Sequence, residues 1–159
     1  MKSIAVINFK GGVGKTTLSY LLGSYLSEYG KKVLLCDIDP QISLTQVIGS
    51  QLEFKELFEH LWNYPKDTTI ISDLADLITF YSKNNGSFPK SVYKNTFIRL
   101  RDNLSIIPSS DSLYGMEFTI RYDNNTKNFF KRFLPKIPAK FKSDYLIFDC
   151  PPTLTPILS

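Results

Sequence analysis

The stretch Lys10-Gly11-Gly12-Val13-Gly14-Lys15-Thr16-Thr17 follows the apolar run Ile4-Ala5-Val6-Ile7 and opens a helical pattern. Three glycines within four positions let a backbone approach a polyphosphate without Cβ clashes. The free N–H groups of such a loop and of the first helical turn point at an anion, and the helix dipole adds attraction there. A strand, a glycine loop, Lys-Thr and a helix in this order therefore predict a phosphate-binding loop.

Individual side chains of this loop have separate expected roles. Lys15 is placed to reach the terminal phosphates of a nucleotide, and the Thr16 hydroxyl is placed to bind the accompanying Mg²⁺. Where the general pattern has its first glycine, this chain has Phe9, and a second lysine, Lys10, directly precedes the glycine pair. Lys10 is long enough to leave its own loop and meet phosphate on a facing subunit. A solvated loop lysine is the alternative interpretation.

Length and composition indicate a globular protein. The 159 residues suffice for one domain with a core, and we expect a single domain over residues 1–159. No apolar run reaches the length of a membrane span, and the N-terminus lacks a secretory pattern, so a cytoplasmic protein is expected. Cys36 and Cys150 each flank an aspartate at the end of an apolar run, and we expect small buried thiols rather than redox or metal sites.

Charge is distributed unevenly along the chain. Residues 1–80 carry 7 basic and 9 acidic side chains, net −2, whereas residues 81–159 carry 12 and 6, net +6. This second half could meet DNA phosphates or an acidic partner, and a solvated helical surface is the alternative. Its basic residues include Arg99, Arg101, Lys127, Lys131, Arg132, Lys136, Lys140 and Lys142.

Apolar strands alternate with helical patterns, which predicts an α/β protein with a parallel sheet covered on both faces. The helix expected at 16–29 carries the apolar stripe Leu18, Leu21, Leu22, Tyr25 and Leu26, which is typical of a face packed on a core. Residues 91–100 are ambiguous. Strands are expected at 3–9, 33–39, 104–107 and 145–149, and helices at 16–29, 42–48, 53–63, 70–81 and 111–133.

Carboxylates stand at the ends of two expected strands. Ligands of parallel sheets bind beyond the carboxyl ends of the strands, and Mg²⁺ needs only one or two carboxylates beside phosphates and water. Asp149 suits the support of a metal-bound water. Asp37 and Asp39 alternate along their strand, and one of them could orient the attacking water of a phosphoryl transfer. Capping of neighbouring loops is the alternative for each aspartate.

Four motifs together resemble the ParA/MinD family of deviant-Walker, phosphate-loop ATPases. Besides residues 10–17, they are VLLCDIDPQ at 33–41, NLSIIPSS at 103–110 and YLIFDCPP at 145–152. Asp-Pro-Gln at residues 39–41 favours the ParA (Soj-like) branch, which partitions plasmids and chromosomes, over the MinD branch. The resemblance covers nearly all of the chain.

The resemblance implies a P-loop NTPase fold, ATP and Mg²⁺ as cofactors, and ATP hydrolysis. Residues 10–17 would hold the nucleotide, with Lys10 reaching across an ATP-sandwich homodimer. Lys15 and Thr16 would hold phosphates and magnesium, and Asp149 and Asp39 would support the metal. Asp39 would also position the hydrolytic water, with Asp37 beside it. The implied partners are non-specific DNA and a ParB-type protein, which would place the protein on the nucleoid.

Two departures from the family pattern matter. Residues 42–45 read Ile-Ser-Leu-Thr, where the family more often has a small residue and asparagine. The chain also stops ten residues past Asp149, whereas the family usually continues much further. We therefore expect the N-terminal two-thirds of a ParA-type domain, incomplete at the C-terminus. Its first strand would be an exposed apolar edge, and the chain would be poorly soluble or self-associating.

Two other functions fit the same motifs. One is a nucleotide-binding module that no longer hydrolyses ATP. The other is a MinD-like, membrane-associated positioning ATPase, which would need a C-terminal amphipathic helix, and the sequence shows none before Ser159. No stable membrane association is therefore expected.

Overall fold

A computed structural model describes residues 1–51, 73–84, 96–116, 129–133 and 141–152. The helix expected at 53–63 lies outside these residues, as do parts of the elements expected at 70–81, 91–100 and 111–133.

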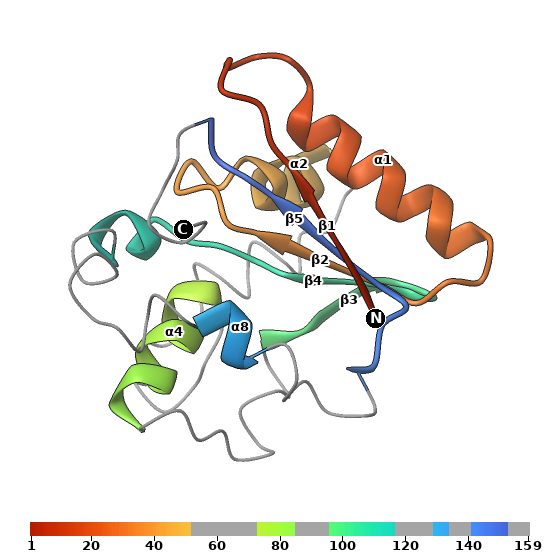
Figure 1. Cartoon of the computed structure of the whole chain (residues 1–159). Coiled ribbons are helices and arrows are strands. Elements are labelled where there is room, and N and C mark those ends of the chain that lie inside the picture. The colour runs from red at the N-terminus through yellow and green to blue at the C-terminus, as the bar shows by residue number, and fades with distance from the viewer. Residues whose placement is uncertain (52–72, 85–95, 117–128, 134–140, 153–159) are drawn as a thin grey trace.

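A five-stranded sheet forms the centre of the molecule, with the order β1-β5-β2-β4-β3 (Figure 1). β1 (Lys2–Val6), β5 (Tyr145–Asp149), β2 (Val33–Asp37) and β4 (Leu104–Ile107) run parallel, which confirms the predicted parallel arrangement. The ambiguous segment contains β3 (Ile98–Arg101), which pairs antiparallel with β4. Only Asp102 and Asn103 join β3 to β4, and such a short connection permits only a hairpin.

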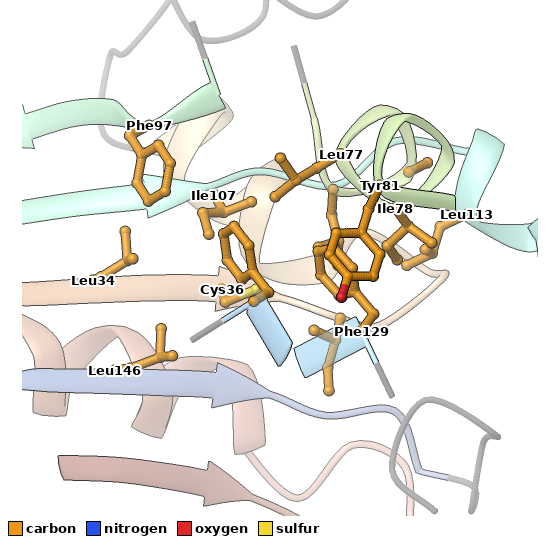
Figure 2. Close-up of a cluster of buried hydrophobic side chains, with 14 of the residues drawn as sticks. Leu34, Cys36, Leu77, Ile78, Tyr81, Phe97, Ile107, Leu113, Phe129 and Leu146 are labelled. Carbon is orange, nitrogen blue, oxygen red and sulfur yellow. The ribbon is translucent and has the colours of Figure 1, made fainter. Parts of the chain in front are cut away.

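Helices cover both faces of the sheet. α1 (Lys15–Glu28) and α2 (Ser43–Gln51) lie on one face, where the apolar cluster includes Leu35, Ile48 and Ile147. α4 (Leu74–Lys83) and α8 (Phe129–Phe133) lie on the other, packed on Leu34 and Leu146. Figure 2 shows this second cluster, to which the strands contribute Leu34, Ile107 and Leu146 and α4 contributes Tyr81. The three-layer α/β architecture is thereby confirmed.

α1 packs on the sheet through small side chains rather than through its apolar stripe. Its buried residues are Ser19, Gly23, Ser24 and Ser27. A Cβ added at Gly23 would lie 2.7 Å from Leu35 Cδ2, so a larger residue at this position would require the Leu35 side chain to move. Leu22 and Leu26 are half-buried against the core. The prediction that the stripe faces the core is wrong for Leu18, Leu21 and Tyr25, which are 55%, 56% and 56% exposed.

β1 forms one end of the sheet. Within the part of the chain that the structure describes, its strand partner is β5 alone. The expected edge position of the first strand is therefore confirmed, and the strand itself is shorter than expected because it ends at Val6. Both cysteines are buried and free, as expected. Among the described helices none is both long and apolar enough to cross a bilayer.

Candidate functional site

The glycine loop joins the carboxyl end of β1 to the first turn of α1. Gly12 and Gly14 have φ values of 71° and 81°, a left-handed conformation that side chains other than glycine rarely adopt. Gly14 is also the N-cap of α1, and Leu18 N donates to its carbonyl at 2.8 Å. A Cβ at Gly11, Gly12 or Gly14 would meet nothing within 4 Å, so the space above the loop is open. The loop geometry fits an anion cradle at a helix N-terminus.

Thr16 and Asp149 meet at the floor of this loop, which links α1 to the end of β5. Thr16 Oγ1 donates to Asp149 Oδ2 at 2.8 Å, and the buried Ser19 Oγ donates to Asp149 Oδ1 at 2.8 Å. Both carboxylate oxygens are thus oriented by α1. Burial raises the pKa of Asp149 above its ordinary value, and the hydrogen bonds from Thr16 and Ser19 work against that rise.

Asp37 is the neighbour of Asp149 in the register between β2 and β5, but its surroundings differ. Its side chain is completely buried, and Oδ2 accepts hydrogen bonds from Thr45 N at 2.8 Å and Thr45 Oγ1 at 2.7 Å. Burial raises the pKa of Asp37 to about 7, although the bonds from Thr45 lower it. Both bonds tie this carboxylate to the first turn of α2, which is the capping role that the sequence left open as an alternative.

Asp39 lies in the turn between β2 and α2. Its Oδ1 accepts from Gln41 N at 2.9 Å, and Ile42 N donates to its carbonyl at 2.8 Å. Asp39 is 6% exposed, and its charge is one of the influences that raise the pKa of Asp149. Ile38 N also donates to the carbonyl of Asp149 at 3.1 Å, so the turn is attached directly to the end of β5.

The two lysines of the loop lie close to each other. Lys15 Nζ donates to the carbonyl of Lys10 at 3.5 Å, and its charge lowers the pKa of Asp149. Lys10 is exposed, and Lys10 N donates to Asn8 Oδ1 at 2.9 Å. The structure therefore brings together Lys15, Thr16, Asp39 and Asp149. The exposed Lys10, Val13 and Thr17 stand at the outer rim of the loop.

The sequence analysis did not identify two residues that contact the carboxylates of this site, Ser19 and Thr45. Ser19 stands one helical turn after Thr16 on the same face of α1, and that spacing was a usable signal. Thr45 contacts Asp37 across a turn whose path no periodicity reveals. The sequence alone gave no indication of this contact.

The donor set of the site suits magnesium bound together with a nucleotide. Over the described residues, no group of three or more histidine, cysteine or carboxylate side chains could hold a metal by itself. Mg²⁺ bound with phosphates needs no such group, because phosphate oxygens and water complete its octahedron. The Thr16 hydroxyl and the Asp149 carboxylate, 2.8 Å apart beneath an open anion cradle, fit that requirement.

Comparison with known proteins agrees with this geometry. A family model described as an AAA domain matches residues 1–159. The sporulation initiation inhibitor protein Soj of Bacillus subtilis (strain 168) is 35% identical over 153 residues, which cover 96% of this chain and 51% of Soj. The chain thus spans about half the length of this curated relative.

Two solved structures share the fold. A Borrelia burgdorferi B31 protein described as a plasmid partition protein, bound to AMPPNP, has a TM-score of 0.71 and 27% identity, over 99% of this chain and 56% of that one. A cobyrinic acid a,c-diamide synthase from Mycobacterium smegmatis, with an ATP analogue and magnesium, also has a TM-score of 0.71 and 27% identity, over 99% and 54%.

The motifs, the site and these similarities converge on one assignment. The deviant phosphate loop precedes α1, the Asp-Pro-Gln turn follows β2, and Asp149 ends β5 beside Thr16. Members of the ParA/MinD family are ATPases. The chain belongs to the AAA domain family whose model spans it, and its similarities group it with the ParA/MinD ATPases.

Proposed function

We propose that this chain binds Mg–ATP at the glycine loop and acts as a ParA-type partition ATPase. The observation that carries the proposal is the contact between Thr16 and Asp149 directly below an open glycine loop. The resident cofactors would be ATP and Mg²⁺, and the metal would supply charge neutralisation for the phosphates. Lys15 would bind the terminal phosphates, Thr16 and Asp149 would hold the metal, and Asp39 would orient a water at the mouth of the loop.

The wider cycle is part of the same proposal. Lys10 stands on the exposed rim, where it can meet the nucleotide of a second subunit, which supports an ATP-dependent homodimer. In this cycle the protein is cytoplasmic and associated with the nucleoid. It partitions a plasmid or a chromosome, binds DNA without sequence preference, and responds to a ParB-type partner. The single domain over residues 1–159 would correspond to the N-terminal part of the longer relatives.

Two of the arginines singled out in the basic half have acidic partners. Arg101 pairs with Glu28 at 3.5 Å, and Arg99 pairs with Asp102. Exposed pairs of this kind contribute little to stability, yet they reduce the positive charge offered to a polyanion. Any DNA contact in the described part of this half would therefore depend more on Lys131 and Lys142, which are exposed, than on these arginines.

Calorimetric titration of ATP and Mg²⁺ tests the proposal most directly. Lys15→Ala should weaken nucleotide binding by about 10- to 100-fold, because it removes charge-assisted bonds to phosphate. Lys10→Ala should bind nucleotide with unchanged affinity but lose ATP-dependent dimerisation in light scattering. Lys31→Ala, an exposed lysine away from the loop, is the matched control.

The outcomes separate the candidate functions. Absence of any nucleotide binding by the unaltered chain rejects the whole proposal. Binding without measurable hydrolysis favours the nucleotide-binding module, and unchanged dimerisation of Lys10→Ala removes Lys10 from its assigned role.

A further inference from the structure

Thr45 connects three segments of the chain at the carboxyl edge of the sheet. Its hydroxyl and its amide both donate to Asp37 Oδ2, at 2.7 and 2.8 Å. The same hydroxyl accepts a hydrogen bond from Ser109 N at 3.0 Å. Asp37, Thr45 and Ser109 are at most 1% exposed. The end of β2, the first turn of α2 and the segment after β4 are therefore joined through one buried hydroxyl.

The contact also satisfies the start of α2. The first N–H groups of a helix have no partners within the helix. Asp37 supplies an acceptor from a neighbouring strand, because the amide of Thr45 donates to its Oδ2. The nine-residue segment from Asp37 to Thr45 is thus closed at its base by the bonds between these two residues.

The turn inside this closed path is strained. Ile42 has a φ of 51°, a conformation that is unfavourable for a β-branched residue. Such a conformation persists only where the surrounding structure over-determines it. Ile42 is buried, its amide donates to Asp39 O, and its carbonyl accepts from Gln46 N, so the strain lies in the same turn as Asp39.

We propose that Thr45 is a positioning residue which, by clamping Asp37 to Ser109, holds the turn at residues 39–42 and with it the Asp39 carboxylate at the mouth of the phosphate loop. The link to Asp39 rests on the proposed function, because it assumes that Asp39 orients a water for attack on phosphate. The clamp itself is a property of the nucleotide-free protein. The competing explanation is that Thr45 contributes only to the general stability of the fold. In that case its loss would affect the turn at residues 39–42 no more than the rest of the fold.

Amide hydrogen exchange of the nucleotide-free protein tests the clamp. Thr45→Val keeps the shape of the side chain but removes its donor and acceptor, whereas Thr45→Ser keeps both. Thr45→Val should speed exchange at Ile42 and Ser109 by about ten-fold relative to β2 and β5, and Thr45→Ser should restore protection. Thr79→Val is the matched control, because the Thr79 hydroxyl contacts Met116 Sδ at 3.8 Å and takes no part in the clamp.

Steady-state kinetics tests the consequence for Asp39. In Thr45→Val, ATP turnover should fall about ten-fold while nucleotide affinity stays within about two-fold, and Thr45→Ser should recover turnover. Exchange that is unchanged, or that rises equally in β2 and β5, overturns the clamp. Equal losses of affinity and turnover overturn the positioning of Asp39. If the unaltered chain neither binds nor hydrolyses ATP, the proposed function fails, and the exchange result still decides whether the clamp exists.

Discussion

The two faces of α1 differ in polarity in a way that reverses the pattern of most surface helices: large apolar side chains are exposed and small residues are buried. The inward face carries the buried Ser19, Gly23, Ser24 and Ser27, with the half-buried Leu22 and Leu26 beside them, and the outward face carries Leu18, Leu21 and Tyr25. If hydrophobic burial alone decided the orientation, the face with the large apolar side chains would pack on the sheet. Close approach to Leu35 and the bond from Ser19 to Asp149 hold it the other way. Position relative to the site, rather than hydrophobicity, therefore decides how this helix is oriented.

The largest expected effect comes from filling the inward face. Gly23→Val would place its Cβ 2.7 Å from Leu35 Cδ2 and 3.4 Å from Leu104 Cδ1, in a completely buried contact. It should lower the free energy of unfolding by about 1–3 kcal/mol, measured by urea denaturation. Leu21→Val puts the same residue on the outward face and should change that free energy by about 0.5 kcal/mol or less. Equal losses in the two variants would show that the inward face is not tightly packed.

A second prediction separates packing from chemistry on the same inward face. Ser19→Ala removes the bond to Asp149 Oδ1, and Ser27→Ala removes a 2.7 Å bond to Ser24 O far from the site. Each should cost about 1 kcal/mol of stability, because each loses one buried hydrogen bond. Only Ser19→Ala should raise the Mg²⁺ concentration needed to support ATP binding, by about ten-fold, since a carboxylate near the metal loses its orientation.

Calorimetric titration of ATP at several Mg²⁺ concentrations provides this measurement. Binding in the absence of Mg²⁺ should be the same in both variants and in the unaltered chain. An identical magnesium dependence for Ser19→Ala and Ser27→Ala would restrict Ser19 to a packing role.

The sequence predicted those features that a local residue pattern determines, such as short apolar strands and the residues at their carboxyl ends. The bounds of β4 and β5 agree with the expected strands, because both are short apolar runs ended by a proline or an aspartate. The juxtaposition of Thr16 and Asp149 follows from the rule that the carboxyl ends of parallel strands share one edge.

The remaining features depend on tertiary contacts that no local pattern contains. The orientation of α1 depends on the distance to Leu35, and the capping role of Asp37 depends on the path of the turn to Thr45. Ile42 occupies a left-handed position where the resemblance led us to expect a small residue. The sequence identified this departure, but only the structure shows that it produces strain beside Asp39.

The smallest expected effect on stability, and the most direct test of the outward face, is a change in self-association. An exposed apolar strip along α1 and its C-cap consists of Leu18, Leu21, Tyr25 and the 67% exposed Tyr29, and β1 leaves its outer edge without a described strand partner. Exposed apolar strips and unpaired edges promote association. Leu21→Lys should therefore reduce the apparent mass in light scattering at high concentration, with a stability change of about 0.5 kcal/mol or less.

Glu28→Gln is the control for charge, because it also makes the net charge more positive by one but leaves the apolar strip intact. It should associate as the unaltered chain does. An effect of Glu28→Gln equal to that of Leu21→Lys would attribute association to charge. If the unaltered chain is monodisperse at high concentration, the exposed apolar face of α1 does not drive self-association. The contrast between the two faces of α1 would then have no consequence in solution.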